Sequence, residues 1–167
     1  MDKDWLAQAV VREAPEAIVV CDPSGTIVLW NGGAERIFGY AADEALGQNL
    51  DLIIPEKQRA RHWAGYEKTM ATGVTKYGDA ELLKVPATHR DGRRLSIEFS
   101  VALLRSTGEH GADENGDEGK IVGIMAVIRD STERWAADRE LKLRLNEAER
   151  KLRELSGDAA KASGTTE

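Results

Sequence analysis

The clearest pattern in the chain is an alternation of apolar and polar side chains between residues 94 and 103. Large apolar residues occupy almost every second position there, with arginine, serine and glutamate between them. This period of two predicts a β-strand with one buried and one solvated face. Further apolar runs, separated by turn residues such as Asp91-Gly92, predict four more strands. We expect an antiparallel sheet with strands near 16–21, 26–30, 79–89, 93–104 and 120–129.

Helical patterns fill the space between these strands. Residues 4–12 form an amphipathic pattern, and Asn31 is placed to cap a short helix that Gly39 ends. A second short helix is predicted over 41–46. Pro55 opens the longest internal helix, over about 56–71, and Gly73 follows it. The mixture of helices with an antiparallel sheet predicts an α+β fold.

The C-terminal part of the chain changes to a heptad pattern. Apolar side chains step by four and three residues through Leu141, Leu145, Ala148, Leu152 and Leu155. We expect this helix to end at Ser156-Gly157 and to pair with a second copy in a parallel homodimer. The small and polar residues after it predict a disordered tail. The expected segments are an N-terminal helix (1–13), an α+β domain (14–133), a coiled-coil helix (134–156) and the tail (157–167).

Composition excludes several classes of function. The net charge of −6 and the pI near 5.2 argue against a nucleic-acid partner, which requires a basic face. No apolar stretch approaches the roughly 20 residues of a membrane span, and the polar N-terminus is unlike a signal peptide. Cys21 is the single cysteine, so an intramolecular disulfide is impossible. We expect a cytoplasmic protein, and the sequence lacks the motifs of hydrolases, nucleotide-binding enzymes and zinc proteases.

The order of these elements over residues 14–133 resembles the PAS fold, a five-stranded antiparallel sheet with helices on one face. The residues that carry the resemblance are Asp22-Pro23-Ser24-Gly25, the segment 30–40, Gly47-Gln48-Asn49, His89-Arg90-Asp91-Gly92 and the segment 129–133. PAS domains are sensors that carry haem, flavin, small acids or no ligand. The flavin photosensors among them place a reactive cysteine after a Gly-x-Asn motif. Leu50 stands there in this chain, so flavin photoadduct chemistry is excluded.

The segment 54–62, followed by Tyr66, is similar to the haem-binding PAS domains of the FixL and DosP families. In those families the histidine at the position of His62, seven residues after Pro55, is the proximal iron ligand. The resemblance implies a b-type haem bound to His62, with Tyr66 beside it. A neutral imidazole on a rigid helix is a suitable iron ligand. The alternative is that His62 only packs against Trp63 or faces water.

The same resemblance implies further pocket residues. Basic residues at the positions of Lys68 and Lys76 pair with haem carboxylates in the FixL family, although both lysines could simply be solvated. Four apolar residues would form the wall around the gas: Phe99, Val101, Ile124 and Ala126. These side chains could equally be ordinary core residues.

FixL-type domains also place an arginine on the strand after the long helix, where this chain has Leu82 or Leu83. That departure argues against a dioxygen-specific role. We therefore expect a sensor of carbon monoxide, nitric oxide, dioxygen or redox state. Its signal would pass through the C-terminal helix to a downstream signalling protein or a fused output domain. The alternative is a PAS module with another small ligand or none, which serves dimerisation and signal relay.

Overall fold

The computed structural model describes residues 2–75, 82–106 and 119–163, with side chains as far as residue 155. The chain divides into two compact units, residues 1–131 and residues 132–167. Among the described residues, the first unit contains a five-stranded sheet and four α-helices, and the second contains one long helix.

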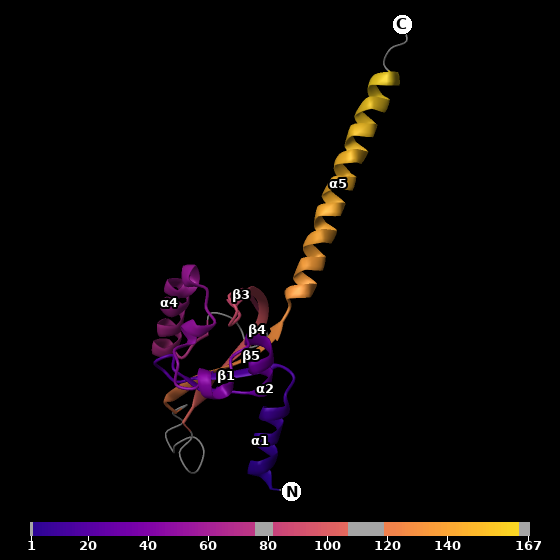
Figure 1. Cartoon of the computed structure of the whole chain (residues 1–167). Coiled ribbons are helices and arrows are strands. Elements are labelled where there is room, and N and C mark those ends of the chain that lie inside the picture. The colour runs from indigo at the N-terminus through magenta and orange to yellow at the C-terminus, as the bar shows by residue number, and fades with distance from the viewer. Residues whose placement is uncertain (1, 76–81, 107–118, 164–167) are drawn as a thin grey trace. The chain divides into compact units, whose positions relative to one another are not determined.

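The first unit is an α+β domain whose strands are all antiparallel, as the sequence predicts (Figure 1). The strand order in the sheet is β2-β1-β5-β4-β3. The strands are β1 (Ala17–Cys21), β2 (Ile27–Trp30), β3 (Leu83–Thr88), β4 (Arg94–Arg105) and β5 (Ile121–Asp130). The helices are α1 (Lys3–Glu13), α2 (Gly32–Phe38), α3 (Ala42–Ala45) and α4 (Glu56–Thr72), with a 3-10 turn, η1, at Leu50–Leu52.

The strand register gathers the apolar residues on one face of the sheet. Val19 of β1 lies opposite Ala126 of β5, which lies opposite Val101 of β4. Residues directly opposite in an antiparallel pair point to the same face. This face packs against side chains of α2, α3 and α4 in a single core that includes Phe38, Ala45 and Tyr66. The sheet therefore carries its helices on the face where the apolar residues converge.

Local signals fix where the helices begin and end. Asn31 caps α2 and Gly39 ends it in the left-handed conformation, at a φ of 80°. Pro55 is the N-cap of α4, and Gly73 ends that helix at a φ of 67°. These four positions confirm the helix limits predicted from the sequence.

Asn31 does more than cap a helix. Its side-chain oxygen accepts hydrogen bonds from the backbone N–H groups of Ala34 (3.0 Å) and Ile18 (2.8 Å). Its amide nitrogen donates to the backbone carbonyls of Val11 (2.9 Å) and Glu16 (3.0 Å). This buried side chain therefore joins the end of α1, the start of β1 and the start of α2.

The second unit is α5 (Thr132–Ser163), which continues past the end predicted at Ser156-Gly157. Glycine inside a helix is less favourable than alanine by about 1 kcal/mol. The segment 158–163 contains three alanines, the strongest helix formers, and the helix runs on through it. The other difference concerns the third strand, which the sequence predicts from about residue 79. The described part of β3 begins at Leu83. Residues 76–81 lie outside the described ranges.

Candidate functional site

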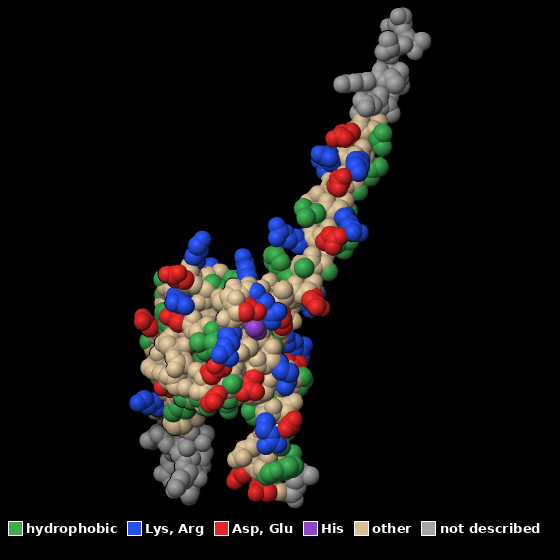
Figure 2. Space-filling model, in the orientation of Figure 1, with side chains coloured by type: hydrophobic (Ala, Val, Ile, Leu, Met, Phe, Trp, Pro, Cys, Tyr) green, Lys and Arg blue, Asp and Glu red, His purple; other side chains and the backbone are tan. Residues whose placement is uncertain are grey.

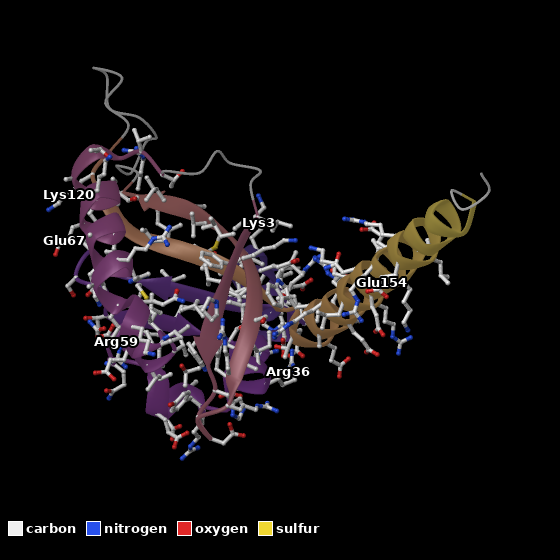
Figure 3. The ribbon with its side chains drawn as sticks, turned by 90° about the horizontal axis from the view of Figure 1, so that it is seen from above. Lys3, Arg36, Arg59, Glu67, Lys120 and Glu154 are labelled. Carbon is white, nitrogen blue, oxygen red and sulfur yellow. The ribbon has the colours of Figure 1, made fainter. Side chains whose placement is uncertain are left out.

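Three aromatic side chains gather on one side of α4. The rings of His62 and Trp63 lie 4.9 Å apart between centroids in an edge-to-face arrangement, and those of His62 and Tyr66 lie 5.8 Å apart. Trp63 and Tyr66 are separated by 5.3 Å. Residues four apart lie on the same side of a helix, so the pair His62 and Tyr66 follows directly from the helical period. Glu67, the next residue along, points away from the sheet (Figure 3).

This aromatic cluster fastens α4 to the turn between β1 and β2. The Tyr66 hydroxyl donates a hydrogen bond to the backbone carbonyl of Asp22. The indole N–H of Trp63 donates to Asp51 Oδ1 at 2.8 Å, which ties α4 to η1 as well. The Trp63 ring lies so close to Gly25 that a Cβ atom there would stand 2.2 Å from it. Helix and turn therefore form one packed unit around His62.

The contact between Trp63 and Gly25 can be tested against a matched glycine. Gly25 and Gly92 both have a left-handed backbone, at φ values of 84° and 86°, but a Cβ at Gly92 would meet nothing within 4 Å. Left-handed backbone costs a residue with a side chain about 1–2 kcal/mol. Gly92→Ala should lose only that amount, whereas Gly25→Ala should lose a further 1–3 kcal/mol or so from overpacking. Urea unfolding measures the stability of both variants. Equal losses would show that the Trp63 side chain moves aside for the added methyl group at no cost.

Burial favours the neutral form of the His62 imidazole. Burial lowers the pKa of His62 below its ordinary value of 6.5, and the nearby carboxylate of Asp51 opposes this only in part. The Nδ1 atom of His62 is buried and has no hydrogen-bond partner among the described residues. A buried polar atom without a partner is unfavourable by about 1–3 kcal/mol. A neutral imidazole with an unused nitrogen is the form in which histidine binds a metal.

The lowered pKa predicts how stability changes with pH. At pH values above the unfolded-state pKa of about 6.5, His62 is neutral in both the folded and the unfolded state. Its burial then adds no pH dependence to the stability. As pH falls, the unfolded chain binds a proton first, so the folded state loses stability until its own lower pKa is passed. We expect wild type to lose more stability than His62→Gln between about pH 7 and pH 5.5. Urea unfolding of ligand-free protein at each pH measures this, and parallel curves would contradict it.

The sheet supplies an apolar wall on the face that bears the core. Phe99 lies opposite Leu83 on one side and Ile128 on the other. Val101 lies opposite Ala126, and Ile124 lies opposite Cys21. The register thus brings five of the predicted pocket residues to one face: Leu83, Phe99, Val101, Ile124 and Ala126. Cys21 shares this face, and its burial raises the pKa of the thiol to about 12.

Other predicted site residues are placed differently. The side chain of Leu82 precedes β3 and is 54% exposed, so Leu82 forms no part of this wall. Lys68 is exposed on α4. Lys76 lies outside the described residues. Within the described ranges no group of three or more histidine, cysteine, aspartate or glutamate side chains could hold a metal ion, and no helix is long and apolar enough to cross a membrane.

Sequence reasoning missed the partners of the aromatic residues. Tyr66 was expected beside the ligand, but its hydroxyl is engaged by Asp22, and burial raises the pKa of Tyr66 above its usual value. Trp63 appeared only as a neighbour of His62. Nothing in the spacing of Trp63 and Tyr66 along α4 indicated contacts to the β1–β2 turn.

Two sensor proteins are similar to this chain in sequence. The Sensor protein FixL of Bradyrhizobium diazoefficiens is 31% identical over 105 residues, which cover 61% of this chain and 20% of that protein. The Oxygen sensor protein DosP of Escherichia coli is 21% identical over 114 residues, which cover 68% of this chain and 13% of that protein. The chain thus spans a fifth or less of these two relatives.

Solved structures resemble the fold. The PAS domain of a protein from Colwellia psychrerythraea superposes with a TM-score of 0.62 at 22% identity, over 79% of this chain and 99% of that one. An RNA-binding Light-Oxygen-Voltage receptor gives 0.65 at 23% identity, over 86% of this chain and 37% of that one. At these identities the likeness shows the fold alone. The sequence model described as PAS domain matches residues 15–133, most of the chain. The chain belongs to the PAS domain family.

Proposed function

We propose that this PAS domain is a sensor that holds a b-type haem through His62 and responds to a diatomic gas or to redox state. The observation that carries the proposal is the neutral imidazole of His62, whose buried Nδ1 has no hydrogen-bond partner among the described residues. A ligand that contains a metal would be coordinated by that imidazole. The similarity to the Sensor protein FixL and the Oxygen sensor protein DosP supports the same reading.

The residues present fit such a group in two respects. His62 stands on a helix that is fastened at Trp63 and Tyr66, so its position is fixed before any ligand arrives. The apolar wall of β3, β4 and β5 would cover a porphyrin with carbon atoms and exclude water. Haem would supply an iron atom able to bind a diatomic gas. Lys68, which is exposed, would stay available to a haem carboxylate only at the rim.

The side chains of the wall also bear on which gas is favoured. Leu83 stands on β3 opposite Phe99, and neither side chain can donate a hydrogen bond. Dioxygen, more than the other two gases, would be stabilised in such a site by a hydrogen-bond donor in the wall. A wall of this composition therefore favours carbon monoxide and nitric oxide over dioxygen. The signal would reach a downstream signalling protein or a fused output domain by way of α5.

A second candidate is a PAS module with a different ligand or none. The observation that favours it is the packing of the His62 ring against both Trp63 and Tyr66, since aromatic contact alone could account for a histidine here. Purified protein mixed with haem separates the two candidates. The haem sensor predicts an intense Soret band from a saturable complex. The second candidate predicts only the broad spectrum of free haem.

A further inference from the structure

The outer side of α4 carries one row of basic and small side chains, which we call the basic stripe. It consists of five exposed residues: Lys57, Arg61, Ala64, Lys68 and Ala71. They follow one another by four, three, four and three positions, so they lie in one row along the helix. The aromatic cluster lies on the opposite side of α4. The two acidic residues of the helix, Glu56 and Glu67, lie together beside the row and outside it.

The three cations of the basic stripe have no partners. Their side chains make no ion pair or hydrogen bond with any residue of the described ranges. In the same unit Arg12, Arg90 and Arg129 each pair with a carboxylate. On α5, acidic and basic side chains are interspersed along the helix, and four of its cations pair with glutamates one turn away (Figure 2). The basic stripe therefore differs from the other charged surfaces of the chain.

The placement of these cations is unfavourable for the isolated helix. Lys57 stands in the first turn of α4, where the helix dipole presents positive charge and favours acidic side chains. Lys57 and Arg61 are four residues apart, and like charges at that spacing repel each other. A glutamate at residue 57 would remove both effects. The stability of the folded domain therefore does not account for the basic stripe.

We propose that the basic stripe is the docking surface for an acidic α-helix of a partner protein. Carboxylates along one side of such a helix would pair with the three cations, and complementary charge of this kind selects a partner. Ala64 and Ala71 are small, so they let a second helix approach closely between the cations. An anionic membrane fits less well, because the stripe offers no large apolar side chain to insert. Duplex nucleic acid would be repelled by a chain whose net charge is −6.

A partner docked there would contact the helix that carries the candidate ligand site. His62 lies on one side of α4 and the basic stripe on the other, so a shift of this helix would reach the partner without passing through α5. The docking itself does not depend on which ligand the domain binds. It is therefore tested on ligand-free protein.

A fluorescent peptide of defined sequence tests the docking by its anisotropy. The probe is an alanine-rich helix of about 20 residues with glutamates in one row, at steps of four and three. We expect saturable binding to the full chain, with a Kd of about 100 µM or lower at about 20 mM salt. Binding should weaken by about tenfold or more at about 300 mM salt, because salt screens exposed charges. A probe with the same glutamates spread around the helix should bind more weakly than the first by about fivefold or more.

Two triple variants with the same net charge locate the surface. The variant Lys57→Gln/Arg61→Gln/Lys68→Gln should weaken probe binding by about tenfold or more. The matched variant Lys3→Gln/Arg139→Gln/Lys142→Gln changes exposed cations elsewhere and should bind as wild type does. Absence of binding at low salt, or equal effects of the two variants, would overturn the proposal. Tighter binding to phosphatidylserine vesicles or to duplex DNA than to the peptide would also overturn it.

A single variant tests the argument from placement. Lys57→Glu should raise the midpoint of urea unfolding, because it removes the repulsion from Arg61 and the unfavourable charge at the start of α4. The same variant should weaken binding of the probe. An unchanged or lower midpoint would show that Lys57 serves the fold itself, and that result would contradict a docking role for the basic stripe.

Discussion

Replacing His62 with alanine is expected to abolish specific haem binding while the PAS fold stays intact. The imidazole is the side chain of the described site best suited to hold iron, because burial keeps the Cys21 thiol protonated and the Tyr66 hydroxyl donates to Asp22. Its removal leaves only apolar burial of the porphyrin. We expect the affinity for haem to fall by at least about 100-fold, which corresponds to about 2.7 kcal/mol of binding free energy. Titration followed at the Soret band gives the affinity, and far-ultraviolet circular dichroism reports the fold.

Two controls separate ligation from general damage. Lys68→Ala alters an exposed residue of the same helix and should change haem affinity only slightly. His62→Gly removes the side chain and leaves space, so added imidazole should restore much of the haem spectrum if an imidazole nitrogen is what the iron requires. Native affinity in His62→Ala would rule out His62 as the ligand. A failure of imidazole to restore the spectrum of a folded His62→Gly would point to a packing role.

The second large effect is expected at Asn31, on the stability of the first unit. Asn31 is 5% exposed and makes four hydrogen bonds to backbone groups of three different elements. Asn31→Ala leaves those groups without their partner in a region that water reaches poorly, and each such group is unfavourable by about 1–3 kcal/mol. Because some of them will relax towards solvent, we expect a total loss of about 3–5 kcal/mol in the free energy of unfolding.

The isosteric variant Asn31→Asp separates the two hydrogen bonds that Asn31 accepts from the two that it donates. Its carboxylate still accepts from the N–H groups of Ile18 and Ala34, but it cannot donate to the carbonyls of Val11 and Glu16. We therefore expect it to destabilise as well, with the loss reduced at low pH, where a protonated carboxyl can donate one hydrogen bond. Urea unfolding at two pH values measures both variants. A loss of less than about 1 kcal/mol in Asn31→Ala would show that the four bonds are easily replaced by water.

The strands and helix ends were predictable because their signals are local. Alternation over residues 94–103 allows only a strand with one buried face, and the glycines at 39 and 73 permit the left-handed backbone that ends a helix. The apolar wall was predictable for the same reason, since every second residue of β4 and β5 shares a face. These features follow from a few neighbouring residues and the period of the element.

Features that depend on distant contacts were not predictable. Asn31 was recognised as a helix cap, but its bonds to Val11 and Glu16 depend on how α1 and β1 approach α2. Spacing along α4 likewise gave no sign that Tyr66 would donate to the carbonyl of Asp22, 44 residues away. Leu82 was assigned to the pocket by counting from other residues. A count fixes position along the chain but cannot show that the side chain is exposed.

The most direct test of the proposed function is a haem titration of the purified wild-type chain, followed by absorption spectroscopy. We expect an intense Soret band that grows linearly and saturates at one haem per chain. The band of the reduced, saturated protein should then shift when carbon monoxide is added. Titration curves that never saturate, or a spectrum identical to that of haem in buffer, would contradict the assignment of haem to His62 and leave a PAS domain with another ligand or none.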